Sequence, residues 1–311
     1  MIRRLAFWTL GAALAGLASS CGGSTSSLTS SQVIAFSSDR ALPPKSEAED
    51  FDTRRLELYL MHTDGSHVER LTRNSLTDVF PAVSRDGRKV AFTRDIHGYA
   101  QVFVIDLRDR KVRMLTHAHA NSGLPAWSPN GRLIAFATDR NAPGGDVIYV
   151  MNADGSGQRP VTHNLPSAND AWPSWAPDGK RLVFARETGS GSGIYTVFVA
   201  GDGLKRLTRD VHSLDTQPAW SPNGTEIAFE SDLFMLPGQI FAMRPDGTKR
   251  RQLTDPGVGA SSRPSWSSDG KRIVFMASRD QHTDIWVMNA DGSHQVQLTR
   301  NRGFAGFPGA G

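Results

Sequence analysis

Pro173-Ser-Trp-Ala-Pro-Asp-Gly179-Lys-Arg-Leu-Val-Phe184 is one of five copies of the same phrase in this chain of 311 residues. The copies begin at 44-, 48-, 45- and 46-residue intervals, at Pro81, Pro125, Pro173, Pro218 and Pro264. Each copy ends in a Leu-Thr or Val-Thr pair 34 to 36 residues after its first proline. Self-similarity at this period is typical of propellers and solenoids.

The copy between Pro125 and Thr162 shows what one repeat folds into. Two β-rich runs, 133–136 and 147–151, lie between shorter extended segments, and Asn-Gly and Asp-Gly pairs mark the turns. These pairs tolerate the positive φ of tight hairpin turns, and no helical period is present. Four short strands, called a to d, in about 45 residues make one propeller blade. A solenoid or sandwich fits less well, because solenoid coils are usually shorter and sandwiches do not repeat a turn motif at fixed offsets.

The number of blades follows from the two ends of the repeat array. Residues 33–72 carry strands b, c and d but lack the Pro-x-Trp-Ser opening, and Pro308 lies 44 residues after Pro264, where a sixth opening is due. We therefore expect the stretch 303–308 to supply the missing strand a and close the ring, which removes free sheet edges. The sequence predicts an all-β, six-bladed β-propeller of four-stranded antiparallel blades over 33–311, with one blade shared by 33–72 and 303–308.

The recurring phrase resembles a known family of repeats. Pro-x-Trp-Ser-Pro-Asp/Asn-Gly-x-x-Ile-Ala-Phe, closing at Asp-Gly and Leu-Thr, is similar to the TolB-type β-propeller repeat over roughly residues 33–308. Blades of this kind also occur beside peptidases and in pectate-type lyases, so the resemblance implies the fold and not one activity. The family pattern also has an α/β domain before the propeller, whereas here we expect only a tether before residue 33.

The first 32 residues have the composition of an export signal and a linker. Arg3-Arg4 precede an apolar run over residues 5–18, and Cys21 is the one cysteine of the chain. A short basic segment, an apolar core and small residues before a cysteine are typical of a lipoprotein signal peptide. We predict a signal over 1–21 with lipidation at Cys21, followed by a flexible Ser/Gly tether over 22–32. The protein is then exported to the periplasm or cell surface and anchored to a membrane.

Composition and charge narrow the classes of partner. The formal net charge is +4, and without Arg3 and Arg4 there are 33 basic and 31 acidic residues, a net charge of +2. The sequence has no block of lysine and arginine and no nucleic-acid motif, so we expect no nucleic-acid partner. It has no cofactor motif either, and we expect no cofactor.

Strand parity divides the loops between two faces of the disc. The a–b and c–d turns are short Asp-Gly or Asn-Gly pairs that turn geometry alone explains. The b–c loops and the d–a linkers share the other face and vary in length and composition, which is where binding residues usually lie. We expect a rim for a ligand or partner there, formed by polar residues and one tryptophan close before the repeated prolines: Asp78, Asn121, Asp170, Trp172, Asp215 and Arg263.

Two further interpretations of this face are possible. Four histidines follow the closing threonines and are candidates for a metal site with nearby aspartates: His117, His119, His163 and His212. Their spacing matches no known metal motif, so polar linker residues are the preferred interpretation and no metal is predicted. The tryptophans at the repeated strand-a position are expected to pack between blades rather than to bind a ligand.

Catalysis has little support in the sequence. There is no Gly-x-Ser-x-Gly elbow before a helix, no His-Glu-x-x-His and no phosphate loop, and we predict no catalytic residue. The preferred hypothesis is a binding scaffold for a protein or peptide partner at the cell envelope. The alternatives are a metal-dependent polysaccharide lyase or hydrolase and a carbohydrate-binding propeller.

Overall fold

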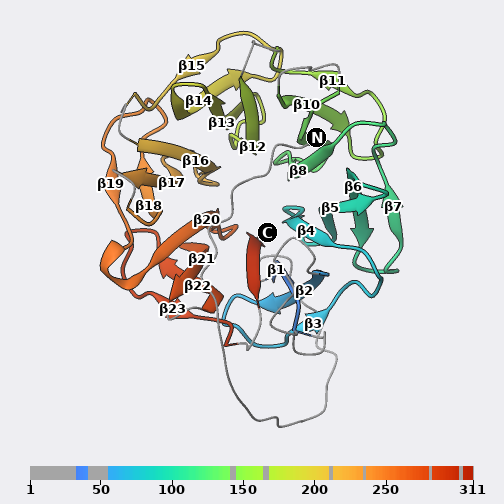
Figure 1. Cartoon of the computed structure of the whole chain (residues 1–311), viewed down its shortest axis with the longest axis horizontal. Helices are drawn as coiled ribbons and strands as arrows, with labels where there is room; N and C mark the ends of the chain where they lie inside the picture. Colours follow the sequence, from blue (N-terminus) through green and yellow to red (C-terminus); the bar gives the residue numbers. More distant parts are fainter. Residues whose placement is uncertain are drawn as a thin grey trace.

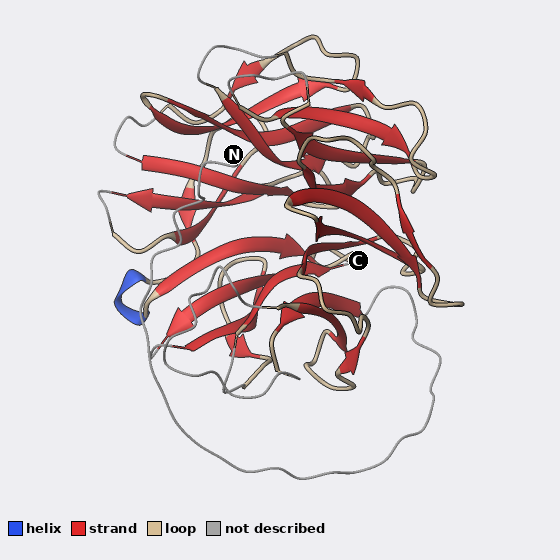
Figure 2. Ribbon diagram, turned by 45° about the vertical axis from the view of Figure 1, so that its right-hand side comes forward, coloured by secondary structure: helices blue, strands red, loops and turns tan. Residues whose placement is uncertain are grey.

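The computed structural model describes residues 33–40, 55–140, 145–163, 168–209, 213–233, 236–279, 282–300 and 304–310. Six four-stranded antiparallel sheets surround a central axis, which confirms the predicted six-bladed all-β propeller (Figure 1). Helical structure among the described residues is limited to the 3-10 turn η2 (Pro256–Val258), the short blue segment at one side of Figure 2. No helix in these ranges is long and apolar enough to cross a membrane.

Each blade runs from strand a at the axis to strand d at the rim. Blade 1 consists of β24 (Ala305–Ala310), β1 (Val33–Ser38), β2 (Glu57–His62) and β3 (Glu69–Arg70). Blade 2 consists of β4 (Asp78–Val83), β5 (Lys89–Ile96), β6 (Tyr99–Asp106) and β7 (Val112–Met114). Blade 3 consists of β8 (Ser122–Trp127), β9 (Leu133–Thr138), β10 (Val147–Asn152) and β11 (Arg159–Pro160).

The remaining blades repeat the arrangement. Blade 4 consists of β12 (Asn169–Trp175), β13 (Arg181–Thr188), β14 (Gly191–Phe198) and β15 (Lys205–Arg206). Blade 5 consists of β16 (Ser213–Trp220), β17 (Ile227–Leu233), β18 (Gln239–Met243) and β19 (Arg251–Gln252). Blade 6 consists of β20 (Ala260–Trp266), β21 (Arg272–Arg279), β22 (His282–Asn289) and β23 (Val296–Gln297).

The ring is closed by a strand from the C-terminal end of the described chain. β24 lies antiparallel beside β1, with Ile34 opposite Ala310 and Ser38 opposite Ala305. The strand starts two residues after the start of the predicted stretch 303–308 and ends two residues beyond it. Blade 1 is therefore built from residues far apart in the sequence, and the two ends of the described chain hold each other in place.

The hydrophobic core lies between neighbouring blades rather than in one central layer. The cluster between blades 1 and 2, for example, joins Leu58 and Leu60 of β2 to Phe92 of β5 and Phe103 of β6. Every strand b contributes one phenylalanine with no exposed surface: Phe36, Phe92, Phe136, Phe184, Phe229 and Phe275. These rings explain the recurring Ile-Ala-Phe run, because the strand-b side chains that face a neighbouring sheet must be apolar to fill that interface.

The a–b turn also follows from its residues. In blade 3, the Ser128 hydroxyl donates to Asn130 Oδ1 at 2.8 Å and accepts from the Leu133 N–H at 2.9 Å. Gly131 completes the turn with a φ of +66°, in the left-handed region that favours glycine. The Ser-Pro-Asn-Gly phrase is thus a structural turn, as predicted.

The repeated proline occupies a different place from the predicted one. It does not begin strand a but lies inside it, at a register shift between strands a and b, such as the one between Val79 and Ala82 opposite β5. The same shift occurs between Ala171 and Ser174 in blade 4. The residue before each proline is left-handed, with φ between +52° and +59°: Phe80, Leu124, Trp172, Gln217, Arg263 and Phe307. Each strand a therefore carries a β-bulge that turns one side chain out of the regular alternation.

Candidate functional site: the central channel

The six bulges meet around the axis of the propeller. The residue before each proline and the proline itself line a cavity of about 120 Å³. We call the six pre-proline residues the channel ring: Phe80, Leu124, Trp172, Gln217, Arg263 and Phe307. A water needs roughly 10–15 Å³ of such volume, so the cavity has room for several waters or one small side-chain group.

Arg263 is the one charged member of the ring, and three aromatic rings surround it. Its guanidinium carbon lies 4.2 Å from the ring centroid of Trp172, 4.2 Å from that of Phe307 and 4.8 Å from that of Phe80. Phe80 in turn meets Trp172 edge-on, with centroids 5.3 Å apart. Attraction between the cation and the ring faces holds the guanidinium in this position.

The guanidinium of Arg263 is buried and has no hydrogen-bonding partner within the described ranges. The residue is 8% exposed, and its Nε makes no hydrogen bond to any residue of those ranges. Its backbone N–H donates to Gln217 Oε1 at 2.7 Å, which also fixes the amide of Gln217 beside it. Burial lowers the pKa of Arg263 to about 9, so the group still carries its charge at neutral pH. Burying a cation without a hydrogen-bond acceptor costs free energy of folding. Its presence at this position therefore indicates that the charge has a function.

Glu230 on β17 is the carboxyl group that acts electrostatically on Arg263. Burial raises its pKa to about 7, while the charge of Arg263 acts in the opposite direction. Its Oε2 is buried and has no hydrogen-bond partner in the described part of the chain, and no ion pair joins it to Arg263 there. Glu230 therefore lowers the positive electrostatic potential around Arg263 but accepts no hydrogen bond from its guanidinium.

Three residues of the predicted rim are internal instead. Asp78, Asp170 and Asp215 have 0%, 1% and 1% of their surface exposed. Asp78 and Asp170 each pair with an arginine of strand b in their own blade. Asp170 accepts two hydrogen bonds from Arg186 at 2.6 and 2.7 Å, and Asp78 accepts two from Arg94 at 2.6 and 2.8 Å. Asp215 accepts from Arg250 at 3.2 Å. The expectation of exposed linker aspartates was wrong because strand a begins before the proline, and so these side chains fall inside the blade.

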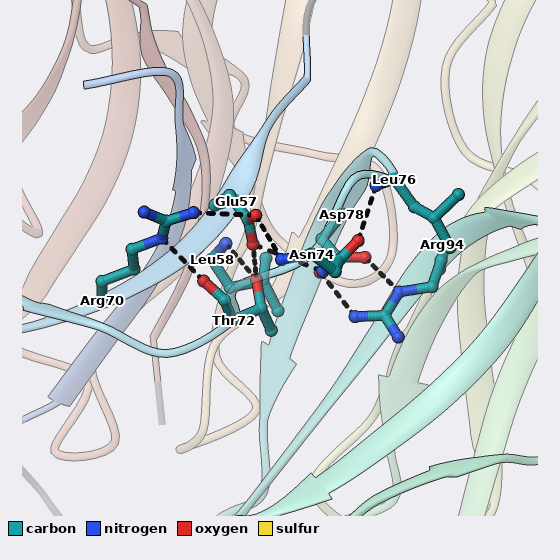
Figure 3. Close-up of polar contacts among 8 residues, drawn as sticks. All are labelled: Glu57, Leu58, Arg70, Thr72, Asn74, Leu76, Asp78 and Arg94. Carbon is teal, nitrogen blue, oxygen red and sulfur yellow. Dashed lines mark hydrogen bonds and ion pairs between the residues drawn. The ribbon is translucent and has the colours of Figure 1, made fainter. Parts of the chain in front are cut away.

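Hydrogen bonds between side chains also link blade 1 to the start of β4 in blade 2 (Figure 3). The Glu57 carboxylate accepts from Arg70, from the Thr72 hydroxyl and from the Asn74 N–H. The Asn74 amide then donates to Asp78 at 2.9 Å. Thr72 belongs to the closing Leu-Thr pair, and its hydroxyl also accepts from the backbone N–H of Leu58. The recurring threonine is therefore a structural residue that joins strands c and d.

Asn121 has a similar structural role. Its backbone N–H and its amide both donate to Asp139, each at 2.7 Å, and its amide oxygen accepts from the Ala100 N–H at 3.1 Å. It precedes β8 and holds the b–c loop of its own blade. Of the six predicted rim residues, Trp172 and Arg263 line the channel.

The TolB β-propeller domain model matches residues 51–141 and 125–304, more than half of the chain. The chain belongs to the TolB β-propeller family. A TolB homologue of Chlorobium luteolum is 31% identical over 187 residues, 60% of this chain and 31% of that protein. The Tol-Pal system protein TolB of Anaeromyxobacter dehalogenans is 35% identical over 103 residues, 31% of this chain and 22% of that protein. The matched segments thus span less than a third of these curated relatives.

Solved structures show the same fold. TolB from Acinetobacter baumannii superposes with a TM-score of 0.75 at 21% identity, over 90% of this chain and 67% of that chain. An oligogalacturonate lyase in complex with manganese superposes with a TM-score of 0.55 at 14% identity, over 80% of this chain and 72% of that chain. At these identities the likeness concerns the propeller alone.

Three of the four candidate metal ligands lie in the described part of this TolB-type propeller, and they form no metal-binding group there. His117, His119 and His163 are exposed, and His212 lies outside the described residues, as does Cys21. Among the described residues no three histidine, cysteine, aspartate or glutamate side chains form a group able to hold a metal ion.

The tryptophans of the strand-a repeat pack between the blades. Trp175, Trp220 and Trp266 are 6–7% exposed and belong to interblade clusters. The indole N–H of Trp127 donates to the carbonyl of Ala82 in the preceding blade, and that of Trp175 donates to Ala126 in the same way. They are therefore fold residues of the TolB-type blade.

Sequence reasoning missed four members of the channel ring: Phe80, Leu124, Gln217 and Phe307. Their signal was available, since each directly precedes a repeated proline and the residue type varies while the proline does not. A variable residue beside a fixed one in a repeat indicates a position whose backbone the fold fixes without fixing the side chain.

Proposed function

We propose that this chain is an exported, membrane-anchored propeller that binds a protein or peptide partner at the cell envelope through the channel ring. Membership of the TolB family supports an envelope role, since one curated relative is named a Tol-Pal system protein. The composition of the channel wall supports binding. Tryptophan and arginine are the residues most often found at the energetic centre of protein interfaces, and here both line one cavity.

The single observation that carries the proposal is the ring itself. Six left-handed residues are held in a conformation that costs about 1–3 kcal/mol each for non-glycine residues. That backbone turns side chains of differing chemistry toward one axis, where all six line the same cavity. A rigid frame that presents varied side chains at its centre is suited to recognition.

Site-specific photo-crosslinking in cells tests this proposal. A photoreactive amino acid at Leu124, in the ring, should give a discrete adduct with one envelope protein. The same amino acid at Lys180, exposed beside the a–b turn, is the matched control and should give none. An adduct from Lys180 alone would contradict binding through the channel.

The anchor has its own test. Lipidation at Cys21 after signal cleavage should hold the protein in the membrane fraction, and Cys21→Ala should release it into the soluble envelope fraction. If the unaltered protein is already soluble after fractionation, the proposed anchor is wrong while binding through the channel stands.

The carbohydrate-related alternatives receive less support from the channel. Sugar binding uses a free aromatic face, and one face of Trp172 is covered by the guanidinium of Arg263 at 4.2 Å. Metal analysis of the purified protein and a glycan array test the lyase and the sugar-binding alternatives respectively. A stoichiometric metal or specific glycan binding would favour them over the scaffold.

A further inference from the structure

Several arginines of the propeller lie over aromatic rings, and three of them form a comparison set for Arg263. Arg94, Arg186 and Arg250 each lie over two aromatic rings of their own blades. Each of these three also pairs with an aspartate of strand a. Arg263 lies over three rings, and no carboxylate among the described residues pairs with it. Arg263 therefore has aromatic surroundings like those of the other three arginines but not the aspartate that pairs with each of them.

We propose that the acid is supplied by the partner: the channel binds a carboxylate, from an acidic side chain or a chain terminus, on Arg263 and Gln217. This inference rests on the proposed function and names the chemistry that the channel recognises. The planar guanidinium fork matches a carboxylate with two parallel hydrogen bonds. The rings hold the fork in place, so little side-chain entropy is lost when the carboxylate binds.

Gln217 provides the second donor. Its amide oxygen accepts from the backbone N–H of Arg263, and its NH₂ group makes no hydrogen bond to another described residue, while Gln217 itself lines the same cavity. An arginine fork and an amide NH₂ side by side offer donors only. Such a pair selects an acceptor-only group, and an ionised carboxylate is one.

The cavity and its charges favour a carboxylate over a phosphate. At about 120 Å³ the space suits one small group. Glu230 acts on Arg263 from nearby, and its negative charge repels a dianion more strongly than a monoanion. The channel has one cation in its ring, whereas phosphate sites usually combine several donors and charges.

Three tripeptides and inorganic phosphate serve as probes. The first is Gly-Glu-Gly capped at both ends, the second is Gly-Gln-Gly with a free C-terminal carboxylate, and the third is Gly-Gln-Gly capped at both ends. Binding is followed by tryptophan fluorescence, because Trp172 contacts Arg263, and by the shift in melting temperature. We expect the capped Glu peptide or the free-terminus peptide to bind at least about tenfold more tightly than the neutral one, the usual effect of a charge-assisted hydrogen bond.

Two variants and one control make the test specific. Arg263→Met should abolish the preference for the acidic probes. Arg181→Gln is the matched control, since Arg181 also lies over a tryptophan, at 5.1 Å from Trp220, but outside the cavity, and it should leave binding unchanged. Glu230→Gln removes the negative charge nearby and should tighten binding of the acidic probes, an effect that a merely structural role would not produce.

The outcomes separate this inference from the proposed function. Equal binding of acidic and neutral probes, unchanged binding in Arg263→Met, or tighter binding of phosphate than of either carboxylate would overturn the carboxylate site. If Arg263→Met does not fold, weaker binding in Glu230→Gln would overturn it instead. A crosslink at Leu124 together with any of these results leaves the proposed function standing and rejects only the chemistry assigned to Arg263.

Discussion

Asp170 and Arg186 form an ion pair that water barely reaches, with side-chain exposures of 1% and 5%. The hydrogen bonds to Asp170 raise the pKa of Arg186, so the guanidinium stays charged. Asp170→Ala leaves that charge buried and unpaired, and the expected loss is about 3–5 kcal/mol in the free energy of unfolding.

Urea denaturation measures this loss. Asp202→Ala, at an exposed turn residue, is the control and should change stability by less than about 0.5 kcal/mol. A loss of similar size in both variants would mean that the Asp170 pair contributes no more than a surface residue.

Glu230 makes a second prediction at the residue scale. Its pKa is about 7 in the folded protein and 4.5 as the ordinary value, so the folded state holds the proton more tightly than the unfolded state. Below pH 4.5 both states are protonated and Glu230 costs nothing, whereas between pH 4.5 and 7 the unfolded state loses its proton first and stability falls. Glu230→Gln removes this term, so its gain over the unaltered protein should be larger at pH 8 than at pH 5, by on the order of 1–3 kcal/mol. Equal differences in unfolding free energy at both pH values would contradict the raised pKa.

At the scale of elements, the closing strand β24 depends on close packing of its glycines. A Cβ added at Gly309 would overlap the carbonyl oxygen of Pro81 in the neighbouring blade. Glycine is therefore required where β24 lies against strand a of blade 2, although a glycine-rich stretch is a weak strand former by its composition.

Gly309→Ala should consequently lower the free energy of unfolding by about 1–3 kcal/mol, the usual cost of overpacking. Gly189→Ala is its control, since nothing lies within 4 Å of a Cβ at that position. Thermal melting compares the two variants. A Gly309→Ala protein as stable as the control would mean that β24 does not pack tightly in solution.

The elements show which parts of the fold were predictable. The turns and the apolar runs could be predicted, because Asn-Gly turns and β-rich segments depend on a few neighbouring residues and repeat at a fixed period. The start of strand a could not be predicted, because the bulge at the proline depends on pairing with strand b, which is a contact across the blade. That error of three to five residues moved Asp78, Asp170 and Asp215 from the interior to the predicted rim.

At the scale of the whole molecule, the channel ring exists only when all six blades are closed. Its members come from positions between Phe80 and Phe307, and no local pattern brings them together. Trp172 and Arg263 were predicted as site residues from their place in the sequence, whereas the aromatic surroundings of Arg263 depend on rings from three different blades. Contacts of this kind follow from ring closure, so the sequence motif predicts the frame and not the environment of the arginine.

Binding of a carboxylate in the central channel is tested by combining the crosslink with the arginine variant. Crosslinking from Leu124 is repeated in cells with Arg263→Met and with Arg181→Gln, at matched protein levels. We expect the envelope adduct to be lost with Arg263→Met and kept with Arg181→Gln. An adduct of equal yield in both variants would contradict the claim that this propeller holds its partner by a carboxylate in the central channel.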